Sequence, residues 1–229
     1  MKSWFKKDNR FSHLGEINQN SSLPYNYVLP KNKDLLRNRP VCSYFKHFLK
    51  PILTKISRAI NFLLVNLPQK SANLDKVDDV TQYLRNINEL NSLFRFFDLR
   101  MYPFTFDVKE MFTNLDHNQI REALNFLLSF YKVIQINQVC VSQNSPKCFL
   151  KKPPQSGFIK ISFQDTCNFV EFDLNLSFST LGKNIMLHQK IGIPMGSPLS
   201  PALARLCVSY NEIQKFRNCK LSNFIHAGR

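Results

Sequence analysis

Acidic residues are scarce in this chain. Its 229 residues include 16 Asp and Glu against 31 Lys and Arg, so the formal net charge is +15. Such an excess favours a polyanionic partner, nucleic acid before a membrane surface, over a basic surface that has no ligand. The shortage is uneven: residues 75–173 hold 12 acidic and 11 basic side chains, whereas residues 1–74 hold 3 and 13, and residues 174–229 hold 1 and 7. One balanced section therefore lies between two sections suited to phosphate groups.

Several other patterns are missing. The six cysteines form no Cys-x-x-Cys pair, which argues against structural zinc and indicates free thiols in a reducing compartment. The N-terminus, MKSWFKKDNR, lacks the apolar segment of a secretory signal. The most apolar stretch, Ile52–Leu67, is interrupted by Lys55 and Arg58 and is too short to span a membrane. These absences predict an intracellular protein, nuclear or organellar and not secreted, without a membrane partner.

What is present predicts a mixed fold. Hydrophobic residues make up 44% of the chain, enough to bury a core in one large domain or two small ones. Helical spacing of apolar residues predicts helices over Ile52–Leu67, Asp78–Phe94 and Asn118–Tyr131, and from Ser200 or Pro201 towards Lys215. Short apolar runs predict β-structure as two extended segments in Leu23–Val41, a strand over Arg100–Asp107, and β-structure in Phe158–Phe163 and Phe169–Phe178. The expected class is α+β.

Asp107 is an isolated carboxylate at a conspicuous place. It ends the apolar run Arg100–Asp107 and precedes the helix expected from Asn118. In so basic a chain, a carboxylate at a strand end is expected to have a metal ion or a phosphate group as its partner. Carboxylate oxygens are ligands that magnesium prefers, so this position is a candidate metal site.

A second informative stretch is HQKIGIPMGSPLSPALARL, His188–Leu206. Gly192 and Gly196 allow the backbone to approach a flat or bulky ligand closely. Ser200 suits a helix cap, and Pro201 suits the first helical turn. Taken alone, this pattern also fits an ordinary tight loop before a helix. Together with an upstream strand that ends in an aspartate, it favours a ligand site.

These two stretches, taken in order, resemble motifs A and B of reverse transcriptases: FDVKEMF, then GIPMGSPLSPALA. Upstream, YVLPKNK and RNRPVCS are similar to the fingers segment of Penelope-like retroelement enzymes, and FDVKEMFTNLDHNQI and Met195 also resemble that group. The resemblance covers Leu23–Arg229. Asp116 stands where the group usually has Pro, and Asn32 where it has His, while GIPMGSPLSP is closer to intron-type enzymes.

The resemblance implies RNA-templated DNA synthesis by nucleotidyl transfer with two Mg²⁺ or Mn²⁺ ions. Asp107 would be the catalytic carboxylate and would bind metal together with the Val108 carbonyl. The implied nucleotide-binding residues are Lys31, Lys33, Arg39, Phe112, Met195 and Gly196, and the implied template–primer contacts are Gly192, Pro194 and Ser197. The implied partners are an RNA template, a DNA primer and deoxynucleoside triphosphates. From spacing alone, Phe112 fits core packing, and the basic residues fit solvated charges.

The implied architecture is the fingers and partial palm of a right-hand polymerase. Residues 1–22 would form a basic polar arm, residues 23–100 a fingers-like region, and residues 101–229 the partial palm. Family members continue into a hairpin with an aromatic residue and two aspartates, and this sequence stops at FIHAGR, about where that hairpin would start. We therefore expect a fragment that is inactive by itself. Two alternatives are a catalytically silent nucleic-acid-binding protein derived from a retroelement, and a basic ribonucleoprotein component whose motif match is chance.

Overall fold

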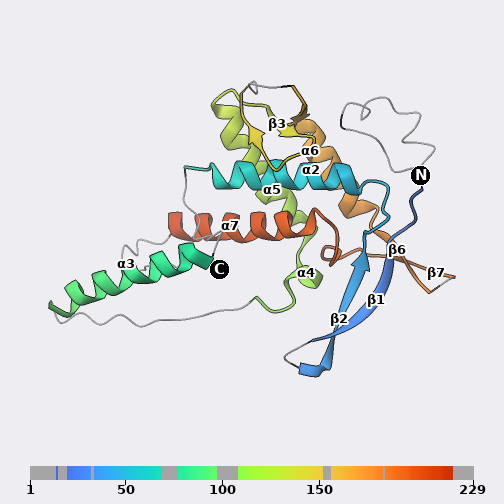
Figure 1. The fold of residues 1–229 in the computed structure, drawn as a ribbon, viewed down its shortest axis with the longest axis horizontal. Coiled ribbons are helices and arrows are strands. Elements are labelled where there is room, and N and C mark those ends of the chain that lie inside the picture. Colours follow the sequence, from blue (N-terminus) through green and yellow to red (C-terminus); the bar gives the residue numbers. More distant parts are fainter. Residues whose placement is uncertain are drawn as a thin grey trace. The chain divides into compact units, whose positions relative to one another are not determined.

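The computed structural model (Figure 1) describes Leu14 and residues 20–31, 34–68, 77–96, 108–151, 156–182 and 184–218. The chain divides into two compact units, one combining the residues up to Asn66 with Glu110–Cys207, and the other combining Leu67–Lys109 with the residues from Val208 onwards. Helices and strands are both abundant, which confirms the α+β class. The proposed division into arm, fingers and palm stays a prediction.

The first unit contains a four-stranded sheet in the order β2-β1-β6-β7. β1 and β2 form an antiparallel hairpin, which confirms the two extended segments expected in Leu23–Val41. β6 runs parallel to β1, and β7 pairs antiparallel with β6 at the edge. Asn26 strengthens the β1–β6 junction because its side-chain amide donates a 2.6 Å hydrogen bond to the Ser179 hydroxyl. The strands are β1 (Tyr25–Lys31), β2 (Asp34–Ser43), β6 (Phe178–Leu181) and β7 (Ile185–His188).

The hydrophobic core of this unit lies among α2 (Lys50–Val65), α5 (His117–Val133), α6 (Phe163–Asn175) and a three-stranded sheet of order β4-β3-β5. Apolar residues at helical spacing bury one face of α2 and one face of α5, which confirms both expected helices. The buried Tyr131 of α5 donates its hydroxyl to the Leu63 carbonyl of α2 at 2.7 Å. The other elements are α4 (Met111–Asn114), β3 (Gln138–Ser142), β4 (Cys148–Phe149) and β5 (Phe158–Ser162).

Helix α6 (Phe163–Asn175) corrects one prediction. The strand expected near Phe158–Phe163 is present as β5, but β-structure was also expected over Phe169–Phe178, and most of that stretch is helical. A capping box starts the helix, because the Ser162 hydroxyl accepts from the Asp165 N–H and the Asp165 carboxylate accepts from the Ser162 N–H. The apolar positions then recur at helical spacing, and they are buried.

The second unit contains α3 (Val77–Phe96), which confirms the helix expected over Asp78–Phe94. Helix α7 (Ser200–Asn218) begins in the first unit, at the serine where a helix start was expected. The strand expected over Arg100–Asp107 lies outside the described residues, as does most of the arm. Among the helices that the structure describes, none is both long and apolar enough to cross a membrane.

Candidate functional site

The GIPMGS turn, Gly192–Ser197, is joined by its backbone to the segment around α4. The Ile193 N–H donates to the Phe112 carbonyl at 2.7 Å, and His117 Nε2 lies 2.8 Å from the Gly192 carbonyl oxygen. Gly192 has a φ of +75°, and a Cβ there would lie 2.4 Å from the Phe112 carbonyl oxygen. The approach therefore requires glycine for both conformation and space.

The other end of the GIPMGS turn meets β2. The Cys42 N–H donates to the Met195 carbonyl at 2.8 Å. Gly196 has a φ of +130°, and a Cβ built there would lie 2.2 Å from the Cys42 carbonyl oxygen. Gly196 is nevertheless exposed on its outer side, and Met195 is half-buried. Three segments that are distant in sequence thus converge in one place: the end of β2, helix α4 and the GIPMGS turn.

Two serines hold the C-terminal side of the turn. The Ser200 hydroxyl donates to the Pro194 carbonyl at 2.8 Å, so it anchors the turn in addition to standing at the helix start. The Ser197 hydroxyl accepts from the Leu199 N–H at 3.3 Å. Both serines are buried. The turn and the first residues of α7 therefore form one hydrogen-bonded piece.

Asp173, near the end of α6, lies at the centre of a buried polar cluster beside the turn. The residue is only 5% exposed, and Ser197 donates to its Oδ2 at 3.2 Å. The Ser177 hydroxyl donates to the backbone carbonyl of Asp173. Cys42 lies at the end of β2, and Tyr44 lies just beyond it. Both are close enough to Asp173 for its charge to affect their pKa values. The cluster thus links β2, α6 and the turn.

Burial controls the protonation of this cluster. It raises the pKa of Asp173 from 3.8 to about 7, although hydrogen bonds from the Ser197 and Tyr44 hydroxyls favour the charged form. Burial also raises the pKa of Cys42 to about 11 and raises that of Tyr44, and the negative charge of Asp173 adds to both shifts. Near neutral pH, Asp173 is therefore the member of the cluster whose charge changes.

The residues predicted for the site fall into different places. Those in the turn are Gly192, Pro194, Met195, Gly196 and Ser197, of which Gly192, Pro194 and Ser197 are buried. Phe112 contacts the turn through its carbonyl, and its side chain is half-buried. Arg39 is exposed on β2, and Lys31 ends β1. Asp107 and Lys33 lie outside the described residues, and the exposed Val108 belongs to the second unit.

The metal ions implied by the resemblance need several oxygen ligands. Of the two expected donors, the structure describes Val108 and not Asp107. Within the described ranges, no group of three or more His, Cys, Asp and Glu side chains is arranged to hold a metal ion. The described residues therefore do not by themselves form a two-ion site, and the Mg²⁺ or Mn²⁺ site stays a prediction.

Asp173 is the functional candidate that the sequence did not reveal. Its one signal was an aspartate among the apolar positions Phe169, Val170 and Leu174, which share a buried helical face with it. An interpretation of this stretch as β-structure hides that signal, because side chains in a strand alternate between faces. Once α6 is recognised as a helix, a carboxylate stands out on its core side.

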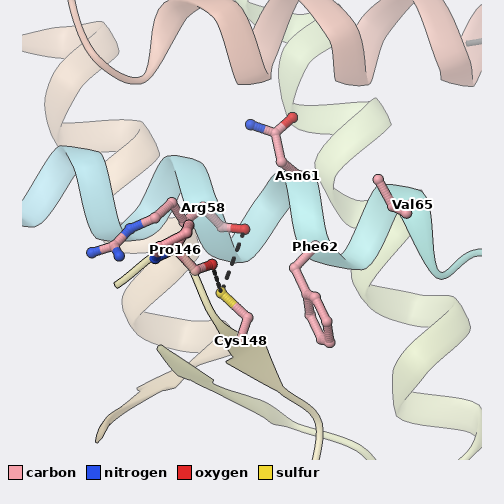
Figure 2. A pocket seen from close by; sticks show the side chains of 6 residues that line it. All are labelled: Arg58, Asn61, Phe62, Val65, Pro146 and Cys148. Atoms are coloured by element: carbon pink, nitrogen blue, oxygen red, sulfur yellow. Dashed lines mark hydrogen bonds between the residues drawn. The ribbon is translucent and has the colours of Figure 1, made fainter. Parts of the chain in front are cut away.

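A separate surface pocket lies between α2 and the turn before β4 (Figure 2). Its volume is about 250 Å³, and its lining consists of Arg58, Asn61, Phe62, Val65, Pro146 and Cys148. Arg58 donates from Nη1 to the Ser145 carbonyl, so part of its guanidinium is already engaged. None of the residues predicted for the nucleotide or template site lines this pocket.

Comparison with known proteins adds no relative. No protein-family model, curated protein or solved structure matches the chain. A function for the chain must therefore be inferred from the geometry of the site and from the resemblance of its motifs.

The contact between the turn and β2 predicts a specific cost for a side chain at Gly196. Gly196→Ala is expected to destabilise the protein by roughly 3 kcal/mol or more, because the new methyl group overlaps backbone and the φ is unfavourable. Gly182→Ala is the matched control, since Gly182 also has a positive φ, +63°, but its Cβ would have nothing within 4 Å. The control is expected to lose about 1–2 kcal/mol. Urea denaturation compares the two, and equal losses would contradict the steric account.

The burial of Asp173 predicts an unusual dependence of stability on pH. Because its folded pKa of about 7 lies above the ordinary 3.8, the folded protein keeps a proton that the unfolded chain has lost between these values. The free energy of unfolding should therefore fall as pH rises through this window and level off above it. Asp173→Asn should remove this trend and be more stable at pH 8 by at most roughly 4 kcal/mol.

Urea denaturation of both proteins at several pH values measures the trend. Asp116→Asn is the matched control, because Asp116 is exposed and caps α5, and asparagine caps helices equally well. The control should retain the wild-type pH dependence. An Asp173→Asn protein that follows the wild-type curve would refute the assignment.

Proposed function

We propose that this chain is the fingers and partial palm of a reverse transcriptase, similar to the RNA-directed DNA polymerases of Penelope-like retroelements. Its partners would be an RNA template, a DNA primer and deoxynucleoside triphosphates. The observation that carries the proposal is that one residue of RNRPVCS, Cys42, and one residue of FDVKEMF, Phe112, both meet the turn of GIPMGSPLSP. Their backbones lie against the backbone of the turn.

The nature of these contacts supports the proposal. They are backbone hydrogen bonds, which nearly any residue can form, and close approaches at Gly192 and Gly196, which require glycine at those two positions of the motif. A match by chance predicts no spatial relation between the segments. Their convergence is what a shared nucleotide and template site requires, because such a site is assembled from several parts of the chain.

The exposed chemistry around the turn suits a nucleotide or a nucleic-acid backbone. Gly196 presents exposed backbone beside β2, where a flat base or a sugar can approach without meeting a side chain. Arg39 lies exposed on the same strand as Cys42, and a guanidinium group binds phosphate in a bidentate manner. The half-buried ring of Phe112 would face the sugar. Phosphate contact and close backbone approach are therefore the two roles assigned to these residues.

Binding to nucleic acid should depend strongly on salt. The net charge of +15 predicts that affinity for a primer–template duplex falls steeply as salt rises, because phosphate contacts release counterions. Arg39→Ala should weaken binding several-fold and reduce the slope of log affinity against log salt by about 1. Arg85→Ala, which removes the same charge from the exposed side of α3, is the matched control and should leave the slope nearly unchanged. Fluorescence anisotropy at several salt concentrations measures both, and a flat salt response would count against a phosphate-binding site.

Primer extension tests the catalytic part of the proposal. On an RNA template with Mg²⁺, the chain is expected to extend a primer little or not at all, because one assigned carboxylate cannot hold two ions in the required geometry. Fusion to a C-terminal hairpin with an aromatic residue and two aspartates should restore extension, and Asp107→Asn in the fused chain should abolish it.

The remaining outcomes separate the alternatives. Robust extension by the unfused chain would show that another acidic residue completes the metal site. Binding without extension by the fused chain would instead favour the catalytically silent nucleic-acid-binding protein.

A further inference from the structure

The junction between the GIPMGS turn, the end of β2 and α6 is built around a single carboxyl group. The Cys42 N–H reaches the Met195 carbonyl, and the Ser197 hydroxyl reaches Asp173 Oδ2. The partners described for the Asp173 carboxyl are hydroxyl groups, those of Ser197 and Tyr44. Hydroxyl groups are neutral, so they do not compensate a buried negative charge as an arginine or lysine would.

We propose that the Asp173 carboxyl is a pH-sensitive latch for the GIPMGS turn. When it is uncharged, it holds the turn against β2 and α6. When it loses its proton, it favours movement of the turn away from the cluster, because that movement admits water to the charge. Asp173 is thus a positioning residue, which acts on the candidate binding site through the turn.

The direction of the effect follows from burial. A carboxylate that is fully enclosed without a cation is costly, whereas the same group is stabilised once water reaches it. The closed arrangement therefore binds the proton more tightly than an open one, consistent with the raised pKa of about 7. By linkage, as pH rises towards that value, the population of the closed form relative to the open form falls by up to about tenfold for each pH unit. Above it the ratio becomes constant.

Opening at Asp173 requires the β2 side of the turn to move. That side is held by the Cys42–Met195 backbone hydrogen bond, the Gly196 contact and the Ser197–Asp173 hydrogen bond, and its residues Met195 and Gly196 are at least partly exposed. Asp173, in contrast, belongs to α6, and its backbone carbonyl accepts from Ser177. Displacement of the turn with Ser197 would bring water to Asp173 without unwinding that helix.

The other titratable groups of the junction do not produce the same response. Burial raises the pKa values of Tyr44 and Cys42, so both stay protonated near neutral pH. His47, whose ring lies 4.7 Å from that of Tyr44, has its pKa lowered by burial to about 4 and stays neutral above that. His117 contacts the Gly192 carbonyl from α5, and its Nε2–H can donate there in both the neutral and the charged ring.

The connection to function rests on the proposed nucleotide and template site. If the turn lines that site, primer–template affinity should be highest when Asp173 is protonated and should decline as pH rises towards neutrality. In Asp173→Asn this decline of affinity with rising pH should be absent, because the amide cannot ionise. A chain that shows the latch but binds no nucleic acid would refute the proposed function and leave the latch standing.

Amide hydrogen exchange of the full chain tests the latch without any ligand. The amides of Cys42 and Ile193 report on the turn because they donate to Met195 and Phe112 carbonyls across the junction. After correction for intrinsic exchange, their protection should fall by up to about tenfold per unit between about pH 5 and 7 and then level off. In Asp173→Asn, protection should be flat over this range, and in Asp116→Asn it should follow the wild type.

Two further measurements separate local opening from general unfolding. Amides in the buried part of α2 should be more strongly protected than the turn amides at every pH. In Ser197→Ala, loss of a hydroxyl that favours the charged form should extend the fall in protection to higher pH. The latch is refuted if wild-type turn protection is flat, if Asp173→Asn keeps the wild-type slope, or if turn and α2 amides have equal protection throughout.

Discussion

The close approach of the Gly196 backbone to the Cys42 carbonyl is the constraint on which the arrangement of the first unit depends. A Cβ at Gly196 would lie 2.2 Å from that oxygen, so the two segments meet only because one of them has no side chain. This contact fixes the turn against β2, and the Ile193–Phe112 hydrogen bond fixes it against the α4 segment. Helix α7 begins directly after the turn, so its start is fixed by the same contacts.

The buried carboxyl of Asp173 is a second constraint, and its charged form disfavours the packing of the turn that the Gly196 contact favours. The packing of the turn excludes water from the carboxyl, and this exclusion makes its charged form unfavourable near neutral pH. The surrounding hydroxyls reduce that cost without removing it. Groups with strongly perturbed protonation are common at functional sites, and here the perturbed group lies behind the residues that the motif resemblance assigns to nucleotide and template. The physical arrangement thus connects the stability of the fold with the state of the candidate site.

Fold class alone does not identify an activity, so the proposed function has to be supported by the local chemistry of the site. Many unrelated proteins combine helices with antiparallel sheets, so the confirmed α+β class is a weak argument for a polymerase. The proposal is better supported by Cys42 of RNRPVCS and Phe112 of FDVKEMF, whose backbones lie against Gly196 and Gly192 of GIPMGSPLSP at distances that leave no room for a side chain on either glycine. Under the proposal, basic side chains such as Arg39 would supply phosphate affinity, but positive charge by itself does not distinguish a template strand from any other polyanion.

The sequence alone determined the elements with strong local signals. The helices α2, α3 and α5, the two extended segments that form β1 and β2, and the start of α7 follow from periodicity, capping and breaking residues, which act over a few neighbouring positions. The same local reasoning was wrong for α6, where an alternating apolar stretch resembled a strand and the capping box at Ser162 decided otherwise. Only the tertiary structure showed that Asp173 is buried beside the turn and that Gly196 meets Cys42. Burial and close approach depend on residues far apart in the chain, so no local pattern contains them.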